Sequence, residues 1–160
     1  DDPPSGLKIF DHEVFPVCAP ALLSRPGGGI RSVADLASHV LLEFETASQG
    51  RPWYDWDQWF TALKIAKFKP AGRQRFSHYD QVVEAVLAGS GIAIGKRPHL
   101  SGKLQDGTLC APFGKEGIAS LGGFSVVVAD AAVGRSAVDA FVGWLRDEAR
   151  QDALNYDSNK

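Results

Sequence analysis

The sequence predicts an α/β protein with a mainly parallel sheet, because short apolar segments typical of buried strands alternate with segments of helical periodicity. The chain has 160 residues, of which 44% are hydrophobic and 22% are charged, and this balance is typical of a globular domain. No apolar run reaches the roughly 18 residues that a membrane span needs, and no signal peptide is expected.

The charge and the cysteines narrow the functional classes further. With a net charge of −2, the chain itself is not expected to bind nucleic acid, because domains that bind nucleic-acid phosphates are usually basic. Cys18 and Cys110 have no paired spacing, so we expect buried thiols in a reducing compartment rather than a disulfide framework. The chain contains no Met and is expected to be part of a longer protein.

The first third of the chain is predicted to hold one strand among short turns and helical segments. Pro16 lies inside the strand-like run, and because proline donates no hydrogen bond to a ladder, we expect an edge or crossover strand. Ser32 and Asp35 have the spacing of a capping box, so a short helix should begin there. In chain order the expected elements are a loop (1–6), a strand (14–18), a helical turn (21–24), a glycine turn (27–29) and the helix after residue 32.

The middle of the chain alternates strands and helices. Four apolar side chains recur at spacings of three and four residues, which predicts one buried helical stripe: Trp53, Trp56, Phe60 and Leu63. Asp80 is expected to cap a second helix, and Gly89 is expected to end it. In chain order the expected elements are a strand (40–44), the aromatic helix, a strand ending at residue 76, a helix (80–87) and a strand (92–94).

The last third is predicted to contain two strands and one long helix. The strands are expected over residues 108–112 and 124–129, where apolar runs stand between turn-forming residues. Ser136 is expected to cap the final helix, which carries apolar residues at helical spacing through Leu145. Residues 151–160 are polar at their end and are expected to be frayed.

Polar side chains gather where two of the predicted strands end. They are Glu43, Glu45, Thr46 and Ser48 at the first strand, and Ser77 and His78 at the second. Ligands of open α/β sheets bind at the carboxyl ends of parallel strands, so we predict that these side chains meet at one rim. Alternation should turn only every second side chain towards a ligand. Glutamates favour a ligand with an amino group, which indicates an amino-acid-like effector, although capping of helices is the alternative role.

Two further clusters leave alternatives open. His78, Asp80 and His99 could bind a metal ion in a small metal-dependent enzyme, but a helix cap with surface histidines explains the same residues. The five cations within residues 64–75 could form an anion-binding edge, while a solvated helix end is the favoured interpretation. We expect neither a metal nor a cofactor.

Several short segments carry a family resemblance when they are taken in order. They are residues 13–23, 35–36 and 39–42, Asp57 with Trp59, residues 85 and 88–93, Gly107 with Leu109, residues 111–113, and residues 140–141, 144–145 and 148–149. Together they span residues 7–150 and resemble the effector-binding domain of LysR-type transcriptional regulators, in the branch of the glycine-cleavage and β-lactamase activators.

The resemblance implies a two-lobed fold of the type II periplasmic-binding-protein kind, with an effector cleft between the lobes and no enzymatic activity. Residues 20–119 would form a nearly whole second lobe, residues 1–19 and 120–150 would be remnants of the first lobe, and residues 151–160 would be a frayed tail. The rest of the first lobe is missing, which should expose apolar surface. That surface is expected around Val126, Val128 and Phe141.

The resemblance also carries expectations about the site and the partners. The pocket would comprise the strand-end residues named above, joined by Phe124 and Ser125 of a returning strand. The whole protein would be a cytoplasmic bacterial regulator that binds a small-molecule effector and assembles as a homo-oligomer, a dimer or a tetramer. It would contact promoter DNA through an N-terminal winged helix-turn-helix that this sequence does not contain. A periplasmic solute-binding protein shares the fold class and remains the alternative.

Overall fold

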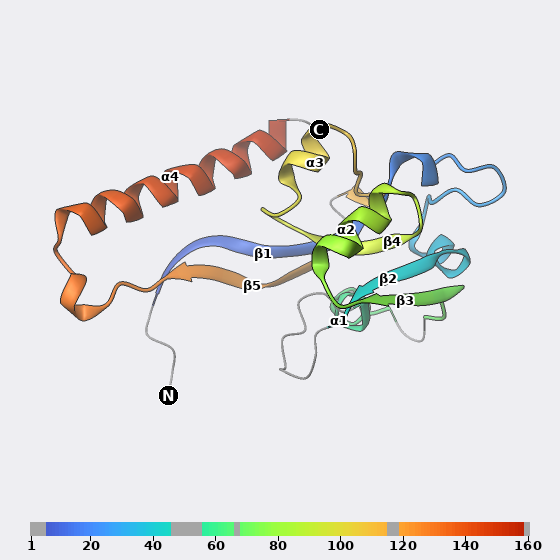
Figure 1. Ribbon diagram of the computed structural model, residues 1–160, viewed down its shortest axis with the longest axis horizontal. Coiled ribbons are helices and arrows are strands. Elements are labelled where there is room, and N and C mark those ends of the chain that lie inside the picture. The colour runs from blue at the N-terminus through green and yellow to red at the C-terminus, as the bar shows by residue number, and fades with distance from the viewer. Residues whose placement is uncertain (1–5, 46–55, 66–67, 115–118, 159–160) are drawn as a thin grey trace. The chain divides into compact units, whose positions relative to one another are not determined.

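The chain forms two compact units in the computed structural model, which describes residues 6–45, 56–65, 68–114 and 119–158 (Figure 1). Unit 1 comprises Asp1–His12 and Ser120–Lys160, and unit 2 comprises Glu13–Ala119. The chain therefore enters unit 2 at residue 13, seven positions before the expected start of the second lobe at residue 20. The assignment of these units to the two lobes of the family stays a prediction.

The sheet has five strands in the order β3-β2-β4-β1-β5. In unit 2, β2 (Val40–Phe44) pairs in parallel with both β3 (Gly72–Phe76) and β4 (Ile92–Lys96), so the expected parallel core of the sheet is confirmed there. The second half of β1 (Leu7–Val17) pairs with β4 in the antiparallel sense. Because β1 begins in unit 1 and ends in unit 2, the prediction of a crossover strand is confirmed.

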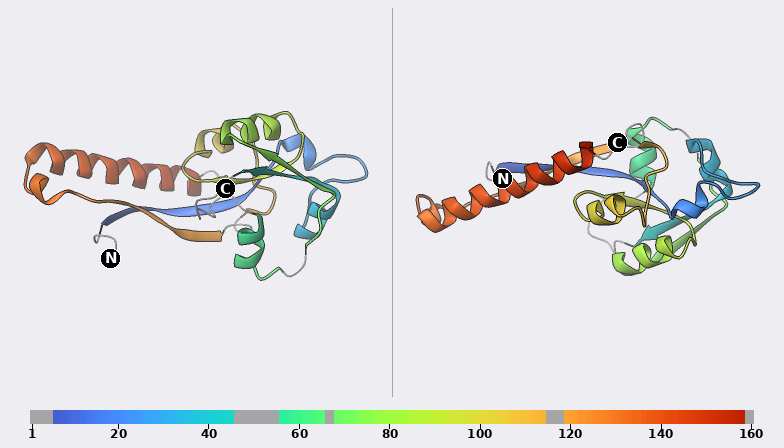
Figure 2. Two further views of the ribbon diagram at one scale, coloured as in Figure 1. Left: turned by 60° about the horizontal axis from the view of Figure 1, so that its bottom comes forward. Right: turned by 90° about the horizontal axis from the view of Figure 1, so that it is seen from above.

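The helices of unit 2 cover both faces of its strands (Figure 2). Helices α2 (Tyr79–Leu87) and α3 (Ser101–Gln105) lie on one face, where Val82 and Val86 pack with Leu42. Helix α1 (Trp56–Ala62) lies on the other face. Two 3₁₀ helices, η1 (Pro20–Leu22) and η2 (Val33–Ser38), occupy the expected short helical segments.

The aromatic stripe of α1 is part of the core. Trp56 and Trp59 are fully buried, Phe60 is nearly so, and the three rings lie 5.3–5.7 Å apart between centroids. Trp56 also donates its indole N–H to the carbonyl of Leu42 at 3.2 Å, which ties the helix to β2. The predicted buried stripe is confirmed at Trp56 and Phe60, whereas Trp53 lies outside the described residues. Leu63 follows the end of α1 and is only partly buried, so the prediction is wrong there.

The helix ends agree with the sequence at two places and differ at two others. Asp35 accepts the backbone N–H of Ser32 at 2.8 Å, which confirms the capping box, and Gly89 ends α2 with φ of +72°. Asp80, however, is not the cap of α2, because the helix begins at Tyr79 and places Asp80 in its first turn. Ser136 is likewise the first helical residue of α4 (Ser136–Ser158) instead of its cap.

Two predictions in the last third are wrong. Residues 108–112 form no strand. Within this segment only Cys110 takes part in β-pairing, through an isolated antiparallel bridge to Cys18. Asp106 accepts the N–H of Thr108 at 2.9 Å and closes a turn in the segment that precedes this bridge. The frayed tail is also wrong up to Ser158, since α4 continues to that residue and its last part, residues 151–158, contains no glycine or proline.

Unit 1 contains the first half of β1, β5 (Ala119–Val126), η4 (Asp130–Ala132) and α4. Strand β5 begins five residues before the expected strand at residue 124. The rings of Phe10 and Phe124 lie 4.8 Å apart between centroids, across β1 and β5. Phe141 is 57% exposed and Trp144 is 55% exposed, so the expected apolar surface is confirmed at Phe141. Val126 and Val128 are only partly exposed, so the expectation is not met at these two residues.

Candidate functional site

The carboxyl ends of β2 and β3 meet at one edge of the sheet. Phe44 is the register partner of Phe76, and the N–H of Glu45 donates to the carbonyl of Phe76 at 2.8 Å. Glu45, Ser77 and His78 are all exposed and follow directly, so they form what we term the strand-end rim. The predicted meeting of the two strand ends is confirmed, while Thr46 and Ser48 lie outside the described residues.

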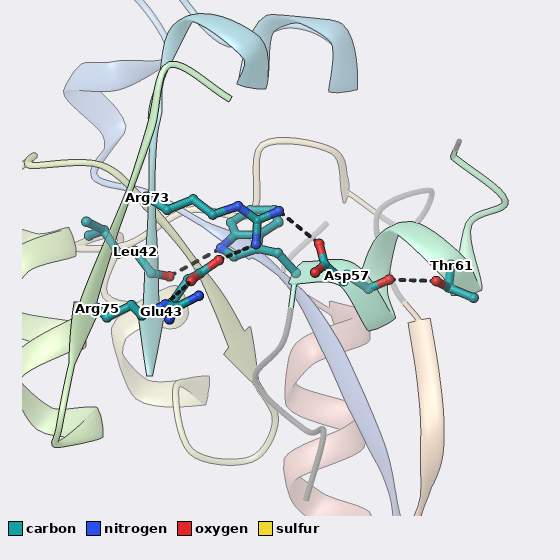
Figure 3. Close-up of polar contacts among 7 residues, drawn as sticks. Leu42, Glu43, Asp57, Thr61, Arg73 and Arg75 are labelled. Atoms are coloured by element: carbon teal, nitrogen blue, oxygen red, sulfur yellow. Dashed lines mark hydrogen bonds and ion pairs between the residues drawn. The ribbon is translucent and has the colours of Figure 1, made fainter. Parts of the chain in front are cut away.

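Glu43 takes part in an ion-pair cluster beside this rim (Figure 3). Its carboxylate receives Arg73 at 2.5 Å and Arg75 at 3.2 Å, and the residue is only 8% exposed. Arg75 is the register partner of Glu43 on the neighbouring strand, which brings the two side chains to the same face. The expectation that Glu43 offers a free carboxylate to a cationic ligand is therefore wrong, because two guanidinium groups already occupy it.

Arg73 joins this cluster to α1. Its second amino group donates to Asp57 at 2.8 Å, and Asp57 lies in the first turn of α1. Burial opposes the charged guanidinium, but hydrogen bonding and attraction from Asp57 and Glu43 outweigh it and raise the pKa of Arg73. The sequence favoured the interpretation that the cations of residues 64–75 form a solvated helix end. That interpretation is wrong for Arg73 and Arg75, which lie on β3 and form ion pairs.

Arg75 leaves most of its guanidinium in solvent. Its Nε atom donates to Glu43, yet its side chain is 66% exposed, compared with 29% for Arg73. The exposed guanidinium of Arg75 and the exposed residue Glu45 give this edge of the sheet one cationic and one anionic group. Sequence reasoning did not include Arg75 in the site, although its place one residue before the end of a strand was the available signal.

A second polar group lies around the start of α2. Ser77 Oγ and His78 Nδ1 lie 3.0 Å apart, so the two predicted site residues contact each other. The ring of Tyr79 packs edge-on against His99 at 6.1 Å, and Lys96 lies 5.8 Å from the Tyr79 ring. Burial and the charge of Lys96 lower the pKa of His99.

The metal alternative finds no support in this geometry. Across residues 6–45, 56–65, 68–114 and 119–158, no group of three or more His, Cys, Asp and Glu side chains could hold a metal ion. His78, Asp80 and His99 therefore do not form the ligand set of the metal-dependent enzyme that the sequence left open.

Phe124 and Ser125 belong to the other unit. Both are exposed residues of β5, and Phe124 packs on Phe10 within unit 1. Glu45, Ser77 and His78 belong to unit 2. A joint role for the two sets of residues remains a prediction from the family resemblance.

Comparison with known sequences identifies relatives over most of the chain. Residues 2–150 match the family described as the LysR substrate binding domain. The glycine cleavage system transcriptional activator of Escherichia coli is 27% identical over 144 residues, covering 89% of this chain and 44% of the activator. The HTH-type transcriptional regulator TrpI of Pseudomonas aeruginosa is 30% identical over 114 residues, covering 69% of this chain and 37% of the regulator.

Comparison with solved structures gives the same fold. The effector domain of the regulator AmpR of Pseudomonas aeruginosa aligns with a TM-score of 0.66 at 24% identity, over 94% of this chain and 68% of that domain. The LysR-type regulator CrgA of Neisseria meningitidis aligns with a TM-score of 0.63 at 19% identity, over 93% of this chain and 50% of that protein. Among the described residues, no helix is both long and apolar enough to span a membrane.

Proposed function

Because this chain belongs to the LysR substrate-binding domain family, we propose that it serves as the small-molecule sensor of a DNA-binding transcriptional regulator. The resemblance seen in the sequence is thereby confirmed at the level of the family and of its fold, including the similarity to the glycine-cleavage activator. The chain spans less than half the length of the regulators it matches, 44% and 37%, so the activity of a whole protein is part of this proposal.

The strand-end rim supports the binding function. The observation that carries the proposal is the pairing of Phe44 with Phe76, which brings Glu45, Ser77 and His78 to one edge at the carboxyl ends of parallel strands. Ligands of open α/β sheets bind at such edges. The proposed site also includes Thr46 and Ser48, which follow Glu45 in the sequence. Phe124 and Ser125 would contribute from unit 1.

The charges at the rim favour an amino-acid-like effector. The exposed guanidinium of Arg75 suits a carboxylate, which it can bind through two parallel hydrogen bonds. Exposed Glu45 suits an ammonium group. Glu43 is excluded from this role because its carboxylate is occupied by Arg73 and Arg75.

Titration with a panel of L-amino acids, followed by backbone amide NMR spectra of the chain, tests the site. We expect a binding amino acid to shift the amide signals of Glu45, Ser77 and His78. Arg75→Ala should weaken the binding by about ten- to hundredfold, because it removes a charge-assisted hydrogen bond. Ser77→Ala should weaken it by about two- to tenfold, because it removes an uncharged one.

Ser90→Ala is the matched control, because Ser90 is also exposed but precedes β4 at its amino end. It should leave the affinity unchanged. If Arg75→Ala, Ser77→Ala and Ser90→Ala all bind the amino acid as tightly as the unaltered chain, the strand-end rim is not the site. If no amino acid shifts these amide signals but another class of small molecule does, only the amino-acid-like effector is contradicted.

The partners of the whole protein follow the family. We infer a cytoplasmic homo-oligomer, a dimer or a tetramer, that contacts promoter DNA through a helix-turn-helix segment outside this sequence. An effector can shift such an assembly between two arrangements only if it binds one of them more tightly. Enzymatic activity is not part of the proposed function, because the family is named for binding and the rim holds groups that suit recognition.

A further inference from the structure

The two cysteines of the chain lie side by side although 92 positions separate them. The N–H of Cys18 donates to the carbonyl of Cys110 at 3.0 Å, and the N–H of Cys110 donates back to Cys18 at 2.9 Å. Their Sγ atoms are 3.6 Å apart, and both thiols are free. This pairing could not be predicted from the sequence, because neither the spacing nor the local pattern of the two cysteines indicates it.

The backbone geometry suits a covalent bond between them. Residues that exchange both backbone hydrogen bonds in an antiparallel pair have Cα atoms about 5.5 Å apart. Disulfides span Cα separations of about 4.4–6.8 Å, so this pair falls within the range. The sulfur atoms must approach from 3.6 Å to a bonding distance of about 2.0 Å, which is a side-chain movement.

The surroundings of the two sulfur atoms differ. Cys18 is fully buried, whereas Cys110 is half-buried. The hydrogen bond between the two thiols lowers the pKa of Cys110, while the same contact and burial raise the pKa of Cys18. Cys110 is therefore the better nucleophile and the more accessible one, and Cys18 is placed to attack it from the protein interior.

We propose that Cys18 and Cys110 are a modification site, which a hydroperoxide oxidises to a reversible disulfide. The Cys110 thiolate attacks one oxygen of the hydroperoxide, the O–O bond breaks, and the other oxygen leaves with a proton as an alcohol or water. Cys110 is then a sulfenic acid. The Cys18 thiol attacks this sulfur, the S–O bond breaks, and the hydroxyl group leaves with the Cys18 proton as water. The two electrons lost by the sulfur atoms are those gained by the hydroperoxide.

The bond would join two distant segments of unit 2. Cys18 directly follows β1, and Cys110 follows α3 and its turn, so the disulfide would hold the end of β1 covalently to the segment that leads towards β5. In a reducing compartment such a bond is transient and reports the oxidant, whereas structural disulfides are rare there.

Hydrogen peroxide is the probe that tests the site. The reduced chain is treated with peroxide, and its intact mass and a peptide map under non-reducing conditions are recorded. We expect the loss of two hydrogen atoms, a peptide pair linked through Cys18 and Cys110, and complete reversal by dithiothreitol. A chain that only gains oxygen atoms, or that links to a second copy instead, would overturn the proposal.

Two single variants separate the roles of the sulfur atoms. Cys18→Ser should stop at a sulfenic acid on Cys110, detected as a dimedone adduct. Cys110→Ser should react with peroxide more slowly by about tenfold or more, because the remaining Cys18 thiol is fully buried and burial opposes its thiolate form. Equal rates in both variants would contradict the assignment of the nucleophile. If either variant fails to fold, the peptide map of the unaltered chain still decides whether the bond forms.

Discussion

Glu43 is a carboxylate that is 8% exposed and is held by two arginines. Glu43→Gln keeps the size of the side chain but removes its charge, so two charge-assisted hydrogen bonds become weaker ones. We expect the free energy of unfolding, measured by urea denaturation, to fall by about 1–3 kcal/mol.

Asp57 provides the matched control for this prediction. It bonds the same Arg73, but its side chain is 70% exposed. Asp57→Asn should therefore lower the free energy of unfolding by less than about 1 kcal/mol, as is usual for surface ion pairs. Similar losses in both variants would show that burial is not what strengthens the Glu43 pairs.

The carboxylate of Asp35 is expected to make the stability of the chain depend on pH. The backbone N–H groups of Arg31 and Ser32, followed by the Ser32 hydroxyl, lower the pKa of Asp35 below its ordinary value of 3.8. Its contribution to stability is therefore complete above 3.8 and is lost as the pH falls through the lower folded pKa. Asp35→Asn should flatten the acid side of a plot of Tm against pH, as recorded by circular dichroism.

Asp147→Asn serves as the comparison, because Asp147 is a surface residue of α4 with a side chain that is 68% exposed. An acid side that is equally steep in the unaltered chain and in Asp35→Asn would contradict the role of the capping box.

The partners of a residue were the least predictable feature of the site. Glu43 was correctly placed near the end of a strand, but its ion-pair partners lie 30 and 32 positions further along the chain. Their contact depends on the register Glu43↔Arg75, which arises from the pairing of two whole strands. A local pattern around Arg73 and Arg75 contains no information on that register, so a solvated helix end was the simpler interpretation.

At the scale of elements, the approach of β4 to β2 constrains one glycine. A Cβ atom on Gly91 would lie 2.5 Å from the carbonyl oxygen of Val40, a backbone atom that cannot rotate away. Gly91→Ala should therefore force the strands apart and lower the free energy of unfolding by about 1–3 kcal/mol. Chemical denaturation measures this loss.

Gly102→Ala is the matched control, because a Cβ atom on Gly102 would meet nothing within 4 Å. Gly102 lies within α3, where alanine is the better helix former, so this variant should gain about 0.5–1 kcal/mol. A loss of stability in Gly102→Ala similar to that of Gly91→Ala would point to a general intolerance of alanine.

Elements with strong periodicity were predictable from the sequence, and weak ones were not. Residues 40–44 and 92–94 are apolar runs of strand length, and the structure confirms both strands. The segment 108–112 has a similar composition but forms only the bridge at Cys110. Its neighbours instead form α3 and a turn closed by Asp106 and Thr108, which shows that turn chemistry outweighed the apolar run.

At the scale of the whole molecule, the aromatic face of α4 predicts self-association. Phe141 and Trp144 lie 5.7 Å apart between ring centroids, and each is more than half exposed. Contiguous apolar surface of this kind is usually covered by a partner. We expect sedimentation velocity to show dimers or larger species that increase with concentration, and Trp144→Glu to shift the population towards monomer.

Arg146→Glu places the same acidic side chain at an exposed position of α4, roughly opposite to Trp144 on the helix. It should leave the sedimentation profile unchanged. A purely monomeric chain at all concentrations would show that this face does not associate.

The family and the fold class could be predicted from ordered short motifs, because these motifs mark turns and strand ends that the fold requires. The division into units was harder to locate. The first crossing lies at residues 12 and 13, inside the continuous strand β1, where no proline, glycine or change in composition marks it. A boundary inside a strand is invisible to patterns that mark domain ends by loops.

The chain passes from unit 1 to unit 2 after His12 and returns to unit 1 after Ala119. These two crossings set an order for folding during synthesis. Unit 2 is one continuous stretch, Glu13–Ala119, so all of its strands have been synthesised before α4 is made. Unit 1 joins Asp1–His12 to Ser120–Lys160, so it can close only after all of unit 2 has been synthesised. Since domains generally fold as units in the order of their synthesis, the first half of β1 should join β5 only after unit 2 has folded, and a chaperone would be most useful in that interval.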